Sequence, residues 1–72
     1  MRNWLRELRK QKGMLQKEVA EKIGLTQSNY NMIEKGERQD DMSLSVIEKL
    51  SEVFDVSILY IVEQEQKRKE AV

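Results

Sequence analysis

The sequence contains no cysteine, no histidine and no proline. Without cysteine, neither disulfides nor thiolate chemistry can hold the chain together. Without histidine as well, a metal site or a catalytic proton relay would depend on carboxylates alone, which is a poor basis for either. The chain also shows no nucleophile–base pair and no phosphate-cradling loop. We therefore expect no enzyme activity, no metal and no cofactor.

Long apolar runs are missing too. No run approaches the roughly 20 residues that span a bilayer, and the start leads into charged residues instead of a signal-peptide core. We expect a cytoplasmic protein without a membrane contact. The 72 residues allow one domain, and a domain of this size buries only about 60% of the surface that its unfolded chain exposes. Little structure is left for an enclosed active-site cavity.

Charge is balanced overall but divided along the chain. Thirteen basic and thirteen acidic residues cancel. Residues 1–39 carry nine Lys or Arg against five Glu, a net charge of +4, whereas residues 40–72 carry four against eight, a net charge of −4. Such a molecule can turn one face to phosphates and the other to solvent.

Glycine is scarce, and its positions divide the chain into helices. Gly13, Gly24 and Gly36 each follow a segment with helical apolar spacing, and glycine is favoured just past helix ends. No segment alternates with period two. We predict an all-α bundle of five short helices: residues 2–12, 16–23 and 26–35, a fourth capped by Ser43, and a fifth capped by Ser57.

The apolar spacing within these segments predicts the core. In the fourth helix, Leu44, Ile47, Leu50 and Phe54 follow one another at spacings of 3, 3 and 4. From the other segments we expect buried side chains at Trp4, Leu5, Leu8, Val19, Ala20, Ile23, Tyr30 and Ile33. Leu15 cannot cap the second helix, so we expect the start of that helix to be less well fixed. We expect a domain over residues 1–63 and a charged, frayed tail over residues 64–72.

Residues 16–35 have the organisation of a helix-turn-helix. Two short helices flank Gly24-Leu25-Thr26, a tight turn that holds them roughly perpendicular. Ala20 is small where the helices would cross. The unit cannot bury its apolar face alone, so the remaining helices must complete the core.

Here the chain resembles the phage-repressor (Cro/repressor, XRE-like) family of helix-turn-helix proteins. The resemblance covers about residues 5–62. The matching stretches are LRELRKQKG at residues 5–13, QKEVAEKIG at 16–24, IEKGER at 33–38, and the stretch from Ser43-Leu44 to Val56-Ser57. It implies a lambda-repressor-like DNA-binding domain whose third helix enters the major groove of double-stranded DNA.

The resemblance also implies roles for single residues. The base-reading positions are Gln27, Ser28, Asn31 and Met32, the phosphate positions are Gln16, Asn29, Lys35 and Arg38, and the structural salt bridge joins Arg9 to Glu34. Glutamine can bond bidentately to adenine, and a polar, mostly uncharged helix face suits base edges. The alternatives are a merely polar helix start at Gln27-Ser28, a packing role for Met32, and solvated surface charges at Lys35 and Arg38.

A run of five large side chains, Ile58, Leu59, Tyr60, Ile61 and Val62, points all round the predicted fifth helix. One core can bury about three of them, and the remainder would form an exposed apolar patch. We interpret the run as the interface of a homodimer, which would place two recognition helices about 34–36 Å apart on a palindromic site. The alternative is a fully buried last helix.

These observations favour a sequence-specific transcriptional regulator, with repression as the simplest outcome. A second hypothesis is the antitoxin of a toxin–antitoxin pair, whose charged tail would meet a protein partner. A third is a protein-interaction module that has lost DNA binding; the zero net charge and Asp40-Asp41, which phosphate would repel, favour it slightly.

Overall fold

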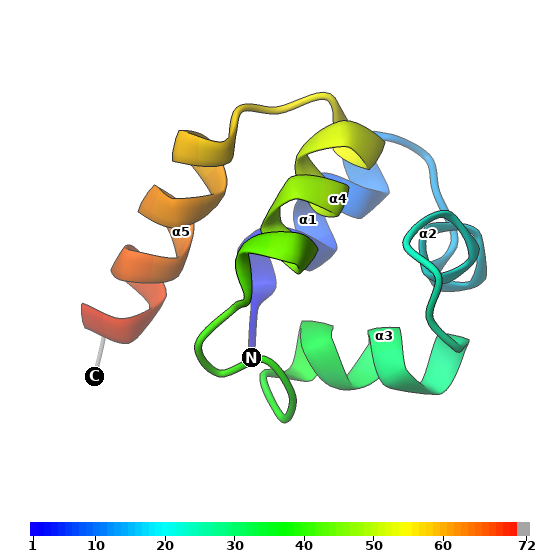
Figure 1. Cartoon of the computed structure of the whole chain (residues 1–72), viewed down its shortest axis with the longest axis horizontal. Helices are drawn as coiled ribbons and strands as arrows, with labels where there is room; N and C mark the ends of the chain where they lie inside the picture. The colour runs from blue at the N-terminus through cyan, green and yellow to red at the C-terminus, as the bar shows by residue number, and fades with distance from the viewer. Residues whose placement is uncertain (71–72) are drawn as a thin grey trace.

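The computed structural model describes residues 1–70, which form five helices and no strand. The helices are α1 (Asn3–Gln11), α2 (Gln16–Lys22), α3 (Gln27–Lys35), α4 (Leu44–Phe54) and α5 (Ile58–Glu70). In Figure 1, α1 and α4 lie together in the middle, with α2 and α3 on one side and α5 on the other. The predicted all-α class is confirmed. Within the described residues, no helix is long and apolar enough to cross a membrane.

The caps explain where the helices begin. The Thr26 hydroxyl accepts from the Asn29 amide at 3.1 Å, and the Ser43 hydroxyl accepts from the Val46 amide at 3.3 Å. Such caps satisfy amides that have no partner within the helix. Leu15 has no capping side chain, but the Glu18 carboxylate accepts from the Leu15 amide at 2.9 Å. The start of α2 therefore keeps one half of a capping box.

The end of α3 needs a glycine. Gly36 takes φ 80° and donates from its amide to the Ile33 carbonyl at 3.1 Å. A Cβ at Gly36 would lie 3.5 Å from an Arg68 nitrogen and 3.7 Å from the Met1 nitrogen. Both distances are ordinary van der Waals contacts, so it is the left-handed backbone that favours glycine here.

The core gathers apolar side chains from all five helices. Its buried members are Leu5, Leu8, Val19, Ala20, Ile23, Tyr30, Ile33, Leu50, Phe54 and Ile61. Each large member stabilises the fold by roughly 1.5–3 kcal/mol relative to an exposed position. The prediction that Leu44 belongs to the core is wrong, because Leu44 is 63% exposed. It is the first residue of α4 and lies at the end of the bundle, whereas Val46 and Ile47 pack against the core.

The charged end of the chain is helical as far as Glu70. The prediction of a frayed tail from residue 64 is therefore wrong for residues 64–70; residues 71–72 lie outside the described part. The reason is that Glu65 is buried and accepts hydrogen bonds from Arg2, Trp4 and Arg68. A charge run is a solvated segment only when nothing in the fold pairs with it.

Candidate nucleic-acid interface

The turn between α2 and α3 sets the two helices across each other. In Figure 1, α2 is seen end-on while α3 lies across the view. Gly24 takes φ 75°, and the Leu25 amide donates to the Ala20 carbonyl at 2.9 Å. Ala20 and Val19 are buried beneath α3. The sequence QKEVAEKIG therefore folds into the first half of a helix-turn-helix.

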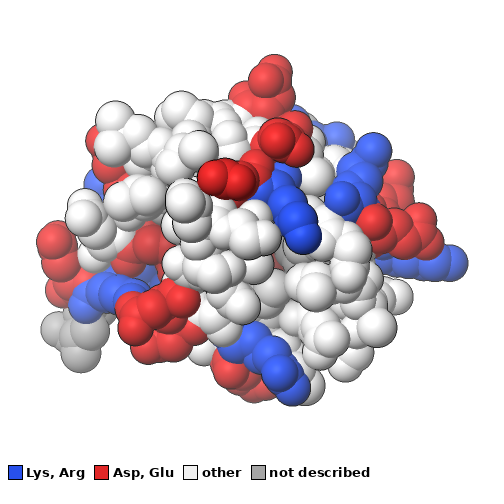
Figure 2. All heavy atoms as spheres, viewed as in Figure 1, with Lys and Arg blue, Asp and Glu red and all other residues white. Residues whose placement is uncertain are grey.

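The outer face of α3 is polar, and its first turn is exposed to solvent. Gln27 and Ser28 are exposed at its first turn, and Asn29 is half-buried. Tyr30 and Ile33 occupy the opposite, buried face. Where α3 is visible in Figure 2, its surface is uncharged, and charged groups gather at the end that leads into the following loop. Two of the four predicted base-reading residues thus have free side chains at the helix start.

The other two predicted base-reading residues are engaged within the protein. The Asn31 carboxamide oxygen accepts from the Gln16 amide at 3.0 Å. The Met32 sulfur accepts from the Arg38 guanidinium at 3.3 Å. Gln16 also donates to Glu34 at 3.1 Å. Gln16 therefore links the start of α2 to Asn31 and Glu34 in the second half of α3.

Arg9 and Glu34 form an ion pair between α1 and α3. Arg9 Nε lies 2.6 Å from Glu34 Oε2, and their side chains are 12% and 4% exposed. Arg9 Nη2 also donates to Glu34 Oε1 at 3.3 Å, and Arg9 Nη1 donates to the Met14 carbonyl at 3.0 Å. Burial of the Glu34 carboxylate opposes its ionisation, but donated hydrogen bonds, first among them those of Arg9, outweigh burial and hold its pKa below the ordinary value. The carboxylate is charged at neutral pH.

A cleft of about 310 Å³ separates α1 from α3. Cationic side chains dominate its lining: Arg6, Arg9, Lys10 and Lys35, together with Met1, Gln16, Asn31 and Glu34. Arg9 is already paired with Glu34, so Arg6, Lys10 and Lys35 leave the cleft with excess positive charge. Two of the four predicted phosphate-contacting residues, Gln16 and Lys35, thus line one basic cleft beside α3.

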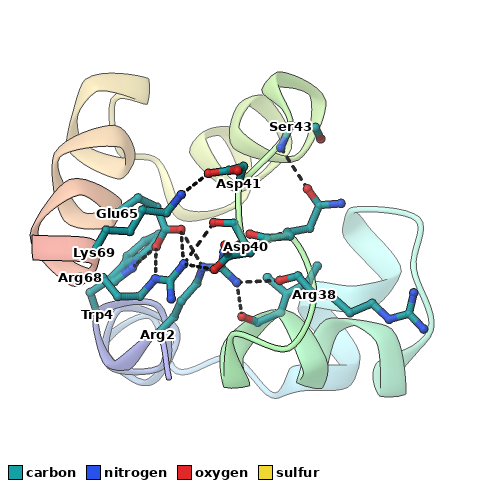
Figure 3. A network of polar contacts seen from close by, with 11 residues as sticks. Arg2, Trp4, Arg38, Asp40, Asp41, Ser43, Glu65, Arg68 and Lys69 are labelled. Atoms are coloured by element: carbon teal, nitrogen blue, oxygen red, sulfur yellow. Dashed lines mark hydrogen bonds and ion pairs between the residues drawn. The ribbon is translucent and has the colours of Figure 1, made fainter. Parts of the chain in front are cut away.

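A polar cluster beside the loop after α3 was not found by sequence reasoning. Arg2 is fully buried. Its guanidinium donates to Glu65 Oε1 at 2.9 Å and to the carbonyls of Ile33 and Arg38 at 2.6 and 2.9 Å (Figure 3). The partners are far apart in the sequence, so spacing gives no direct signal. The only indication is that Glu65 follows Ile61 by one helical turn and shares its buried face.

The two aspartates of this loop have partners on α5. Arg68 Nη2 lies 3.6 Å from the Asp40 carboxylate, and Lys69 contacts the Asp41 carboxylate. Because these pairs are solvent-exposed, each contributes little stability. Their effect on the interface is to offset the negative charge that phosphate would repel.

The first turn of α5 carries an apolar patch. Ile58, Leu59 and Tyr60 are exposed, and Leu59 is 64% exposed. Val62 is half-buried. The prediction that Ile61 also belongs to an interface is wrong, because Ile61 is fully buried in the core. The helical period places only part of a five-residue run on the outer face.

Comparisons with known proteins agree with this architecture. A family model described as helix-turn-helix matches residues 5–61. The "Uncharacterized HTH-type transcriptional regulator YqaE" of Bacillus subtilis (strain 168) is 34% identical over 65 residues, which is 90% of this chain. The chain spans about half (54%) of the length of that relative. No solved structure matches significantly. With more than half of its length matched, the chain belongs to the XRE-type helix-turn-helix family.

Proposed function

We propose that this chain is a sequence-specific double-stranded DNA-binding transcriptional regulator. The observation that carries the proposal is the outer face of α3, where Gln27 and Ser28 are exposed at a capped helix start and Gln16 braces the helix from α2. An α-helix fits the major groove, where side chains can distinguish all four base pairs. Gln27 is the main base-reading residue of this proposal and Ser28 a weaker one.

Asn31 and Met32 are assigned a secondary role in base reading. Asn31 retains a free amide NH₂ group while its oxygen is held by Gln16, so it can still donate to a base. Met32 is half-buried beneath Arg38 and can offer a thymine methyl only an apolar contact. Asn29, Lys35 and Arg38 bind the phosphates, and Gln16 joins them by giving up one of its two side-chain bonds to Asn31 and Glu34. The basic cleft beside Gln16 supplies non-specific affinity that falls with salt.

The regulator acts as a homodimer on a palindromic operator. The exposed side chains of Ile58, Leu59 and Tyr60 support this part of the proposal, since a patch of this kind on a small protein marks an interaction surface. A two-fold axis through α5 would repeat α3 on the next turn of the duplex, about 34–36 Å away. Repression by occlusion of the promoter is the simplest consequence.

The two other hypotheses receive less support. The hypothesis of a protein-interaction module rests in part on the negative charge of Asp40 and Asp41, and both carboxylates form ion pairs with basic side chains of α5. The antitoxin hypothesis has the charged tail over residues 64–72 meet a protein partner, but Glu65 already accepts from Arg2 and Trp4, and Arg68 already donates to the Asp40 carbonyl. The exposed apolar patch at the start of α5 is therefore a better docking surface for a protein partner than the tail is.

The decisive experiment measures binding to the DNA upstream of the protein's own gene across a salt series. We expect a footprint over a palindrome and an affinity that falls steeply as salt rises. In the Gln27→Ala variant, specific binding should weaken by about 1–3 kcal/mol while binding to random DNA is unchanged. Ser45→Ala, at an exposed position on α4, is the matched control. Equal loss on operator and random DNA would remove Gln27 from base reading, and no binding at low salt would refute the proposal.

A further inference from the structure

The loop over residues 36–42 leads from α3 to α4 and carries Arg38 (Figure 1). On its inner side, three successive backbone carbonyls face charged side chains from the two ends of the chain. Arg2 donates to the carbonyls of Arg38, at 2.9 Å, and of Gln39, and Arg68 donates to that of Asp40 at 3.2 Å. Within residues 1–70, no other protein group donates to these three oxygens.

The conformation of this loop is not one that the chain adopts by default. Gln39 has φ 57°, in the left-handed region that a residue with a Cβ seldom occupies. Its carbonyl accepts from Arg2 and its side chain accepts from the Ser43 amide at 3.0 Å. The surrounding structure must therefore impose the conformation.

Arg2 and Arg68 are themselves held by one carboxylate. Glu65 Oε1 accepts from Arg2 at 2.9 Å, and Glu65 Oε2 accepts from Trp4 at 2.9 Å and from Arg68 at 3.1 Å. Arg2 is fully buried and Glu65 nearly so. Removal of the Glu65 charge would leave the buried guanidinium of Arg2 without its counter-ion, and both arginines would lose their orientation.

The outer side of the loop faces the proposed interface. Figure 3 shows the Arg38 guanidinium extending away from the cluster, while the backbone of Arg38 faces into it. Arg2 also receives the end of α3, since its amide donates to the Glu34 carbonyl at 2.7 Å and its guanidinium to the Ile33 carbonyl at 2.6 Å. The same cluster therefore fixes the end of α3 and the loop that presents Arg38.

We propose that Glu65, Arg2 and Arg68 form a clamp in which α5 and the start of the chain position the loop over residues 36–42 for contact between Arg38 and a DNA phosphate. The three are positioning residues and do not touch DNA themselves. This inference rests on the proposed function. It assigns to the charged half of α5 a task in DNA binding that is separate from dimerisation through the first turn of that helix.

The test compares Glu65→Gln with Glu63→Gln. Both variants remove one negative charge from α5, but Glu63 is exposed and is not part of the clamp. Amide hydrogen exchange reports on the loop, and binding to a short duplex of arbitrary sequence, with its salt dependence, reports on the phosphate contact. Both are measured well below the melting temperature of each variant.

We expect faster exchange of the Arg38 and Ser43 amides, which donate to the Met32 carbonyl and to the Gln39 side chain, and about two- to thirtyfold weaker duplex binding for Glu65→Gln only. The slope of log affinity against log salt should fall by about 0.9, the value of one lost phosphate contact. Charge alone predicts the opposite sign, because loss of a carboxylate favours DNA binding, as we expect for Glu63→Gln. If Glu65→Gln only lowered the stability of the fold and left Arg38 in place, the slope of log affinity against log salt would not change.

Equal exchange in the two variants would overturn the inference, and so would a loosened loop with unchanged duplex affinity and salt slope. If Glu65→Gln does not fold, Arg68→Gln against Lys67→Gln gives the same comparison with one positive charge removed from each. Failure of the unaltered protein to bind any duplex at low salt would refute the proposed function. Binding by the unaltered protein, with Glu65→Gln indistinguishable from Glu63→Gln, would refute only the clamp.

Discussion

The ion pair between Arg9 and Glu34 gives the sharpest stability prediction. In the variant Arg9→Met, the Glu34 carboxylate, 4% exposed, loses its counter-ion. Breaking a buried pair from one side costs about 3–5 kcal/mol, because an uncompensated charge remains. Gln16 still donates to Glu34 at 3.1 Å, which favours the lower end, about 3 kcal/mol. A domain of this size is stable by about 4–11 kcal/mol, so the variant loses a large fraction of its stability.

Urea unfolding followed by helical circular dichroism measures this loss at one protein concentration, since dimer formation would otherwise contribute. Arg6→Met is the control: Arg6 is exposed on the same helix, and its loss should change the stability by no more than about 0.5 kcal/mol. The double variant Arg9→Met with Glu34→Gln should be more stable than Arg9→Met alone, within the coupling range of about 0.5–3 kcal/mol. If Arg9→Met and Arg6→Met lose the same stability, the pair does not act as a buried ion pair.

Three further predictions follow from burial and charge. The pKa values of Glu34 and Glu65 lie below the ordinary 4.5, so the unfolded chain takes up protons first as the pH falls. The stability that these carboxylates contribute above pH 4.5 should therefore be lost as the pH drops through their lowered pKa values. In Glu65→Gln, the melting temperature should fall less steeply with decreasing pH, and an unchanged pH dependence would contradict this. The buried Tyr30 hydroxyl lies beside Glu34 and Arg9 but makes no hydrogen bond of good geometry within the described residues, so Tyr30→Phe should change the melting temperature little, whereas a clear decrease would reveal a bond to Glu34. Leu59→Asp should convert the proposed dimer to a monomer in sedimentation without unfolding it, since Leu59 is 64% exposed; an unchanged mass would locate the interface elsewhere.

Local patterns were sufficient to predict most of the helices. Thr26 and Ser43 mark the starts of α3 and α4 because a capping hydroxyl acts on an amide only three residues away. Gly36 marks the end of α3 because its left-handed backbone is an equally local requirement. Leu44 was misplaced because apolar spacing gives a face but does not say where the neighbouring helices stop covering it.

The candidate site was predictable where the family motif fixes it. The motif brings Gln16, Gln27 and Ser28 to one side of the helix-turn-helix through residues that are close in the sequence. It did not reveal that the Asn31 oxygen is already occupied by Gln16, or that Met32 lies against Arg38. Rotamers and competing partners decide such contacts, and a pattern of residue types contains neither.

The sequence by itself determined the starts of the helices, the turn at Gly24 and the polar outer face of α3, because caps, glycine backbone angles and helical periodicity act over a few residues. Only the tertiary structure decided which charged side chains are buried and which partners they have. Arg2 and Glu65 lie 63 residues apart and look like solvated surface residues, yet they form the centre of a buried cluster. A charge can be buried only where counter-ions and carbonyls from other segments converge on it, and that convergence exists only after the chain has folded.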